Sequence, residues 1–173
     1  MKVPCCSLVA KNRENEVVGI SLNTIYKYDD LPQSTQNATV EDYKLLIDEG
    51  PYENRNANRL AVFIDGAEEG LFKFVSPWAK IFKLDILAVR SDQAGKGLGS
   101  YLLKSALELA VRHQCTHVAT CATAQASQRL FIKKSFLTVK ETFFEDFKDN
   151  GDPIYTKVPD HGKSAKLMLL PLQ

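Results

Sequence analysis

The sequence predicts one α/β domain over residues 1–173, with helices flanking a mixed central sheet. Three observations predict this fold class: two β-rich runs open the chain, strands alternate with helices in its second half, and the composition is that of a globular domain. Hydrophobic residues make up 45% of the chain and charged residues 25%. A chain of 173 residues can bury one core and is too short for two of ordinary size.

The first elements are predicted to be a hairpin and a helix. Residues 7–11 and 17–26 are β-rich and flank a polar turn. After a loop, Thr39 is placed to cap a helix that stops at Gly50-Pro51. The apolar run over residues 60–64 fits a helix or a strand, because short apolar runs do not decide between the two.

In the second half, strands and helices are expected to alternate. Polar residues recur at every fourth position from Ser100 to Arg112, which predicts a long amphipathic helix. The expected elements are a strand over 81–89, a glycine-bearing turn, a helix ending near 113, a strand over 117–121, a helix over 127–134, a strand over 136–144, a turn over 149–152 and a strand over 166–170.

Charge and hydropathy argue against two classes of partner. The chain has 22 Lys and Arg against 21 Asp and Glu, so it offers no field that would attract a nucleic acid or a membrane surface. No apolar run approaches the roughly 20 residues of a membrane-spanning helix. The four cysteines lack a C-x-x-C spacing, which favours free thiols and a cytoplasmic location.

The turn between the strand over 81–89 and the long helix carries the strongest functional signal. It has glycines at positions 95, 97 and 99. The first N–H groups of a helix have no partner within the helix, and glycines let an anion approach them closely. We therefore expect a phosphate-binding turn, and a plain glycine-rich connection is the alternative.

Two commoner phosphate-binding motifs do not fit this turn. The Rossmann fingerprint G-x-G-x-x-G needs its last two glycines three positions apart, and here they are two apart. The P-loop ends in Gly-Lys-Ser/Thr, but Gly95-Lys96 is followed by Gly97. The tripeptide Gly162-Lys163-Ser164 has Lys157 at the position of the upstream glycine.

The turn resembles the acyl-CoA signature of the GNAT superfamily of N-acetyltransferases, a strand followed by Q/R-x-x-G-x-G/A and a helix. Aligned on Gly97 and Gly99, the usual Arg or Gln position holds Ala94. The resemblance implies the GNAT fold, with a mixed, mostly antiparallel central sheet and flanking helices. It also implies that main-chain groups of Leu87 and Val89 bind the pantetheine arm of acetyl-CoA. The residues implied for the pyrophosphate are Ala94, Gly95, Lys96, Gly97, Leu98, Gly99 and Ser100.

A second segment extends the resemblance. Residues 126–136 are similar to the family's A-x-x-L-Y-x-x-x-G-F helix and turn, with Phe131 in place of the tyrosine and Ser135 in place of the glycine. That tyrosine is often the general acid toward the leaving thiolate, and a phenyl ring has no proton to donate. Any acid must therefore be another group or solvent.

The early hairpin and residues 144–155 resemble the invertebrate arylalkylamine N-acetyltransferases. This implies direct acetyl transfer from acetyl-CoA to a small-molecule primary amine such as dopamine, serotonin or tryptamine, and we expect a monomer or weak dimer. In the insect relatives the base is a glutamate on a helix upstream of this hairpin, so the chain is expected to be N-terminally shortened. Two alternatives are an acyl-CoA-binding but catalytically impaired module and an acetyltransferase for polyamines or protein amines.

Direct attack requires a neutral amine, so a base or a water relay must remove a proton at pH 7. Asp85 is the candidate base, because strand alternation predicts that it shares a side with Leu87. An ordinary aspartate paired with Lys83 is the alternative. By resemblance to active-site serines of the insect enzymes, Thr123 and Ser127 could steer a proton or the thiolate, and Ser127 would equally suit an N-cap.

No metal site is expected. His113, Cys115 and His117 lie at i, i+2 and i+4 across a helix end and do not converge. Cys121 is not expected to be a nucleophile, because no histidine stands at a recognisable spacing. Aromatic residues that could wall an amine pocket, with core packing as the alternative, are Tyr26, Tyr28, Phe63, Phe72, Phe74 and Trp78.

Overall fold

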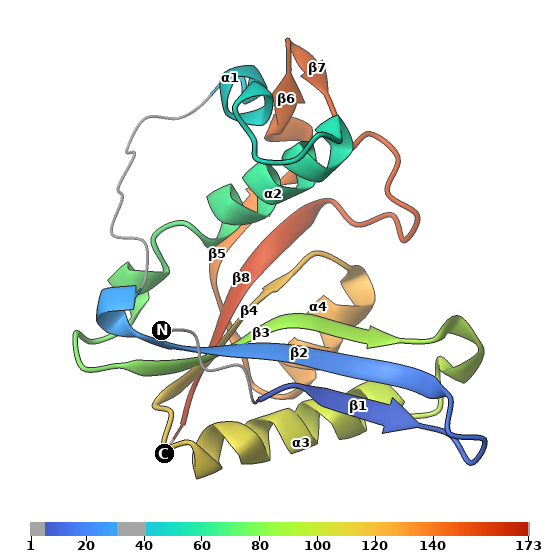
Figure 1. The fold of residues 1–173 in the computed structure, drawn as a ribbon. Helices are drawn as coiled ribbons and strands as arrows, with labels where there is room; N and C mark the ends of the chain where they lie inside the picture. Colours follow the sequence, from blue (N-terminus) through green and yellow to red (C-terminus); the bar gives the residue numbers. More distant parts are fainter. Residues whose placement is uncertain (1–5, 31–40, 173) are drawn as a thin grey trace.

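The computed structural model describes residues 6–30 and 41–172, which form a six-stranded sheet in the order β1-β2-β3-β4-β8-β5 (Figure 1). Its strands are β1 (Leu8–Lys11), β2 (Val17–Lys27), β3 (Lys80–Val89), β4 (His117–Ala122), β5 (Leu137–Phe143) and β8 (Ser164–Pro171). Neighbours pair antiparallel except β3 and β4, which run parallel. The expected α/β class with a mixed, mostly antiparallel sheet is confirmed.

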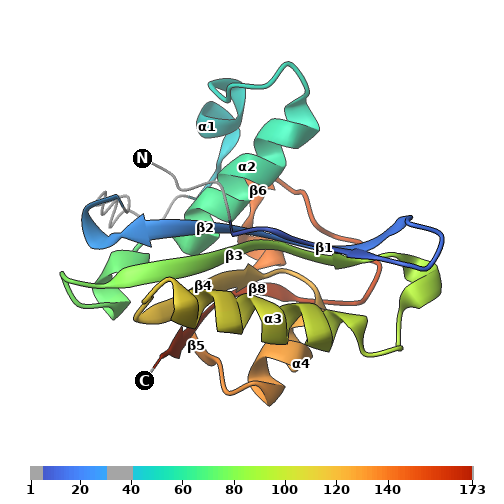
Figure 2. The same cartoon turned by 60° about the horizontal axis from the view of Figure 1, so that its bottom comes forward.

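Helices cover both faces of the sheet, as Figure 2 shows. The helices are α1 (Lys44–Asp48), α2 (Arg55–Glu68), α3 (Leu98–Arg112) and α4 (Gln125–Lys133). Four short 3₁₀ turns are η1 (Tyr28–Asp30), η2 (Leu71–Phe74), η3 (Ser91–Gln93) and η4 (Phe144–Asp146), and β6 (Lys148–Asp149) pairs with β7 (Asp152–Pro153) in a separate hairpin. Helices α3 and α4 lie on one face, and α1 and α2 on the other.

The two faces of the sheet bury separate apolar clusters. On the α3 face, Leu103 and Ala106 of α3 and Phe131 of α4 pack against Phe82 and Leu84 of β3. On the α2 face, the cluster consists of Ile47, Phe63, Ala67, Phe144, Phe147 and Ala165. The polar positions that predicted an amphipathic helix, Ser100, Lys104, Glu108 and Arg112, are exposed. The buried residues of α3 are Leu102, Leu103, Ala106 and Ala110, which share the opposite face because residues three and four apart lie together on a helix.

The ambiguous run over residues 60–64 is helical and lies within α2. The side chain of Asn54 caps this helix by accepting from the amides of Asn56 and Ala57. Helix α2 begins five residues before the apolar run, with polar residues. The capping residue Asn54 therefore marks the start of the helix, which the apolar run does not. The expected cap Thr39 lies outside the described residues, and α1 begins at Lys44 after Tyr43.

Within the described ranges, no helix combines the length and the apolar character that crossing a bilayer demands.

Replacing Phe82 with alanine should lower the free energy of unfolding by about 3–5 kcal/mol, because it empties a fully buried site in the α3-face cluster. Urea denaturation followed by circular dichroism measures the change. Val111→Ala is the control, since Val111 is 57% exposed on α3 and should change stability by less than about 0.5 kcal/mol. Equal losses in both variants would contradict the assigned core.

Candidate active site

The turn before α3 presents a row of backbone donors. Gly95 and Gly97 have φ angles of 76° and 81°, and Gly97 is the N-cap of α3 without a side-chain cap. In the part of the chain that the structure describes, the amides from Gly95 to Ser100 donate to no protein acceptor. A Cβ at Gly95 or Gly97 would meet no atom within 4 Å, so this surface is open. We call residues 95–100 the cradle.

Arg90 fixes the segment that leads into the cradle. Its amide donates to the carbonyl of Val18 at 2.9 Å, and its guanidinium pairs with Asp92 at 2.7 Å and Glu16 at 3.1 Å. The Arg90 guanidinium lowers the pKa of Asp92 to about 2, so the pair stays charged at neutral pH. The cradle is thereby joined to the hairpin of β1 and β2.

Beside the cradle, β3 and β4 separate. Their parallel pairing runs from Ile81 and His117 to Leu84 and Thr120 and goes no further. Beyond that point β3 pairs only with β2, and β4 pairs only with β8. The hydroxyl of the buried Thr120 donates to the carbonyl of Leu84 at 3.0 Å. We call this divergence the fork. The edge of β3 that faces it includes Leu87.

A bulge reverses the two faces of β3 at Asp85. Leu22 lies opposite Ile86 and Asn23 opposite Leu84, so Asp85 is the extra residue. Leu84 and Leu87 both pack in the α3-face cluster although they are three positions apart. The expectation that Asp85 shares a side with Leu87 is therefore wrong, because simple alternation fails across a bulge.

Asp85 ends a row of charged groups on the α2 face. Thr24 Oγ1 donates to Asp85 at 2.6 Å, and Lys83 Nζ lies 3.0 Å from Asp85 and 2.6 Å from Glu68 at the end of α2. Burial raises the pKa of Glu68, which Lys83 partly offsets. Burial would lower the pKa of Lys83, but Glu68 and Asp85 together raise it. The carboxylates of Asp85 and Glu68 thus share the ammonium group of Lys83. The ion pair between Asp85 and Lys83 that the sequence suggested as an alternative is present.

Cys121 lies on β4 near this row. Burial, and then the charge of Glu68, raise the pKa of Cys121 to about 12. A thiol with such a pKa stays protonated at neutral pH and is a poor nucleophile.

A cavity of about 440 Å³ opens on the α2 face, past the end of β4. Its walls are mainly apolar and aromatic, with the hydroxyls of Thr123 and Tyr155 and one carboxylate. The residues that define its character are Phe63, Phe144, Tyr155, Leu60, Thr123 and Asp160. Another hollow of about 460 Å³ lies along α3 between Lys104 and Arg112, among charged side chains and away from the fork.

The two candidate hydroxyl residues have different surroundings. Thr123 lines the cavity, whereas Ser127 donates its hydroxyl to the carbonyl of Ala124 at 2.7 Å. Ser127 is not the N-cap of α4, because Ala124 holds that position. The carboxylate of Asp160 accepts the first amide of the helix, that of Gln125, at 2.6 Å. The N-cap alternative for Ser127 is therefore wrong.

Most of the aromatic residues suggested by the sequence lie elsewhere. Of the six, Phe63 lines the cavity. Tyr28 and Phe72 contact each other edge to face at 6.4 Å, and Trp78 is 81% exposed. Phe131, at the position of the family's tyrosine, is 2% exposed inside the α3-face cluster.

Sequence reasoning missed Glu68, Asp160, Phe144 and Tyr155. Glu68 gave no signal, since its helix was ambiguous in the sequence. The two aromatic residues lie in the segment whose resemblance to the insect enzymes was recognised, but only the folded chain shows that they face Phe63. Among residues 6–30 and 41–172, no three potential metal ligands gather into a site.

The fork, the cradle and the order of elements can be compared with known proteins. A model of the acetyltransferase (GNAT) family matches residues 28–136, a range that contains β3, the cradle and α4. The chain belongs to this family. The GNAT fold expected from the sequence is thereby confirmed. Among curated proteins, none matches the sequence significantly.

Several solved structures share this fold. Arylalkylamine N-acetyltransferase 2 from Aedes aegypti is 25% identical, with a TM-score of 0.74 over 98% of this chain and 74% of its own. The Drosophila melanogaster polyamine N-acetyltransferase that forms N-acetylagmatine is 14% identical, with a TM-score of 0.69 over 96% and 75%. The C-terminal condensation domain of Ebony, solved with β-alanyl-dopamine, is 15% identical, with a TM-score of 0.69 over 98% and 73%. The last two likenesses show the fold alone.

Replacing Asp160 with alanine should destabilise the protein by about 1 kcal/mol at pH 7, because the first turn of α4 loses its acceptor. Amides of Gln125 and Gly162 hold the pKa of Asp160 below its usual value of 3.8. The contribution of Asp160 is therefore fully present above pH 3.8 and is lost as pH falls through the lower folded pKa. Urea denaturation of both proteins across pH 3–7 measures this difference, and a difference that grows toward low pH would contradict it.

Proposed function

We propose that the chain transfers the acetyl group of acetyl-CoA directly to a primary arylalkylamine. The observation that carries this proposal is the cradle, six consecutive amides without a protein acceptor that open beside the fork. Amides at the positive end of a helix dipole suit the pyrophosphate of an acyl-CoA. The family to which the chain belongs supports the same donor.

Two segments around the fork would bind two parts of the cofactor. The cradle, with Ala94 at its entrance, would hold the pyrophosphate through main-chain donors, because its glycines leave room for the anion. The backbone of Leu87 and Val89 is paired with β2 on one side and faces the fork on the other. That free edge would bind the amide groups of the pantetheine arm, and the cofactor supplies a thioester as acetyl donor.

The cavity on the α2 face would hold the amine. Its aromatic side chains suit a ring, and Asp160, its one carboxylate, already accepts amides of Gln125 and Gly162. A polyamine would require more negative charge than this wall offers, since each ammonium group needs a counter-ion when it loses water. The cavity therefore favours an arylalkylamine over a polyamine.

In the proposed reaction, the neutral amine nitrogen attacks the thioester carbonyl, a C–N bond forms and the C–S bond breaks with its electron pair on sulfur. Asp85 accepts the amine's proton, directly or through water, and Thr24 and Lys83 hold its carboxylate in place. The hydroxyls of Thr123 and Ser127 are the proposed donors toward the departing sulfur. A protonated Cys121 supports transfer without an acyl-enzyme.

A second candidate function is an acyl-CoA-binding module with impaired catalysis. Phe131 favours it, because the buried ring replaces the tyrosine that the family often uses as general acid. The enzyme is proposed to act in the cytoplasm as a monomer or weak dimer.

Gly97→Val should weaken CoA binding about 100-fold, or about 2.7 kcal/mol, because a branched side chain would occupy the anion site. Isothermal titration calorimetry with CoA gives the dissociation constant. The matched control is Gly70→Val, which introduces the same residue at an equal φ of 81° far from the cradle. Unchanged affinity in Gly97→Val would refute the placement of the phosphates.

Purified protein with acetyl-CoA should release free CoA faster with tryptamine or dopamine than with agmatine or spermidine, by about tenfold or more in kcat/KM. The reason is the aromatic, nearly neutral cavity wall. A thiol-reactive dye measures the released CoA. Calorimetric CoA binding without turnover of any amine would select the impaired module, and a preference for spermidine would overturn the assignment of the amine.

A further inference from the structure

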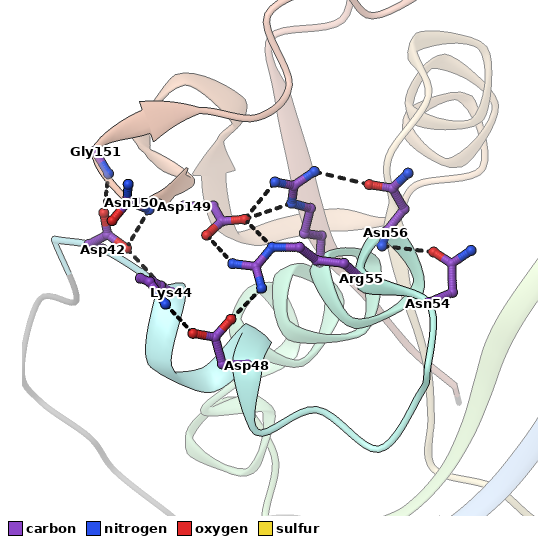
Figure 3. Close-up of polar contacts among 10 residues, drawn as sticks. Asp42, Lys44, Asp48, Asn54, Arg55, Asn56, Asp149, Asn150 and Gly151 are labelled. Carbon is purple, nitrogen blue, oxygen red and sulfur yellow. Dashed lines mark hydrogen bonds and ion pairs between the residues drawn. The ribbon is translucent and has the colours of Figure 1, made fainter.

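A buried carboxylate locks the β6–β7 hairpin onto α2. Asp149 at the end of β6 is 2% exposed at its side chain, and its two oxygens accept from Arg55 Nη2 at 2.6 Å and Arg55 Nε at 3.0 Å. Arg59 adds a bond from Nε at 2.8 Å and an ion pair from Nη2 at 2.6 Å. Figure 3 shows Arg55 directed at Asp149 from the first turn of α2. We call Asp149, Arg55 and Arg59 the clamp.

Other contacts surround the clamp without replacing it. Asp42 accepts amides of Asn150 and Gly151 at the tip of the hairpin, and Asp48 of α1 pairs with Lys44 and with Arg55 (Figure 3). Asp48 touches α2 and no residue of the hairpin in these contacts. Within residues 6–30 and 41–172, the ion pairs between the hairpin and α2 therefore all involve Asp149.

The segments joined by the clamp carry the aromatic wall of the cavity. Phe63 of α2 lies 5.4 Å from Phe144 and 5.0 Å from Tyr155, measured between ring centroids, and all three line the cavity. Phe147, two residues before Asp149, stacks on Tyr155 at 5.6 Å and contacts Phe63 at 5.3 Å. The position of the hairpin relative to α2 thus sets the spacing of these rings.

Stability alone is a poor explanation for this arrangement. Removing the Asp149 carboxylate from water costs several kcal/mol, and an ion pair with a buried partner often adds little net stability. The side chains of Arg55 and Arg59 stay 42% and 28% exposed, so the carboxylate is the one buried ion of the clamp. What bidentate contacts provide is a fixed distance and angle between two segments. Here the fixed quantity is the separation of the hairpin from α2.

We propose that Asp149 is a positioning residue for the acceptor, which acts through Arg55 and Arg59 to hold the aromatic wall at the spacing that receives the amine's ring. This inference rests on the proposed function. Weakening the clamp lets Phe147 and Tyr155, which flank the hairpin, move away from Phe63, so a ring-bearing amine loses contact area while the cofactor cradle is unaffected. The effect falls on KM for the amine and leaves the chemical step intact.

Asp149→Asn tests the proposal, because it keeps the size of the side chain and removes its charge. We expect KM for tryptamine to rise about tenfold, with kcat within about twofold of the wild type and CoA affinity unchanged. A short aliphatic amine without a ring should show the same KM in both proteins. General loosening of the fold would instead affect both amines and CoA alike, and that outcome would overturn the proposal.

Asp48→Asn is the matched control, since it touches the same Arg55 without reaching the hairpin. Its KM for tryptamine should equal that of the wild type, and a rise equal to that in Asp149→Asn would contradict the specific role of Asp149. Should Asp149→Asn fold poorly, Arg59→Lys keeps one charge and removes the second bond, and a smaller rise in KM is expected.

The outcomes also separate this inference from the function on which it rests. If the wild type acetylates or binds tryptamine and Asp149→Asn does so with equal KM or dissociation constant, the clamp has no positioning role and the acceptor cavity stands. If the wild type neither turns over nor binds tryptamine in calorimetry with CoA present, the acceptor assignment fails and the positioning role fails with it.

Discussion

The site depends on one interruption in backbone pairing, at the end of the parallel ladder between β3 and β4. After Leu84 and Thr120, each strand keeps its other neighbour, so both remain ordered while they diverge. Because an unpaired strand edge keeps its donors and acceptors, the divergence leaves backbone groups of β3 and β4 without a sheet partner on the side that faces the fork. The cradle lies beside the fork, and the cavity lies on the α2 face.

Both sides of the sheet bury apolar clusters, but they differ in the polar contacts that accompany this packing. On the α3 face, aliphatic and aromatic side chains such as Leu103 and Phe82 are fully buried, and packing provides the stability. On the α2 face, charged groups such as Lys83 and Asp149 are bound by several directional contacts. Burial of ions stabilises little but fixes geometry. The face proposed to bind the amine is therefore the one whose geometry is set by directed bonds.

Local signals made the strands, the long helix and the cradle predictable, because each depends on residues close in sequence. The glycines at 95 and 97 predicted a turn, and both have a positive φ in the structure. Features that depend on distant residues were not predictable. Asp149 and Arg55 are 94 positions apart, and Glu68 meets Lys83 only in the folded chain. The face of Asp85 was predicted wrongly, because no residue type marks a bulge and alternation assumes that none is present.

Because of the bulge at Asp85, the fold depends on the number of residues in β3 as well as on their types. One additional residue lets the first half of the strand direct Leu84, and the second half Leu87, toward the same helix, although the two are an odd number of positions apart. Deleting one residue at the bulge would keep the amino acids that follow it unchanged. It would nevertheless turn the side chains between the bulge and the cradle to the opposite face of the sheet. Strand β3 should therefore tolerate substitutions more readily than insertions or deletions, because a change in the number of residues changes the face of every later side chain.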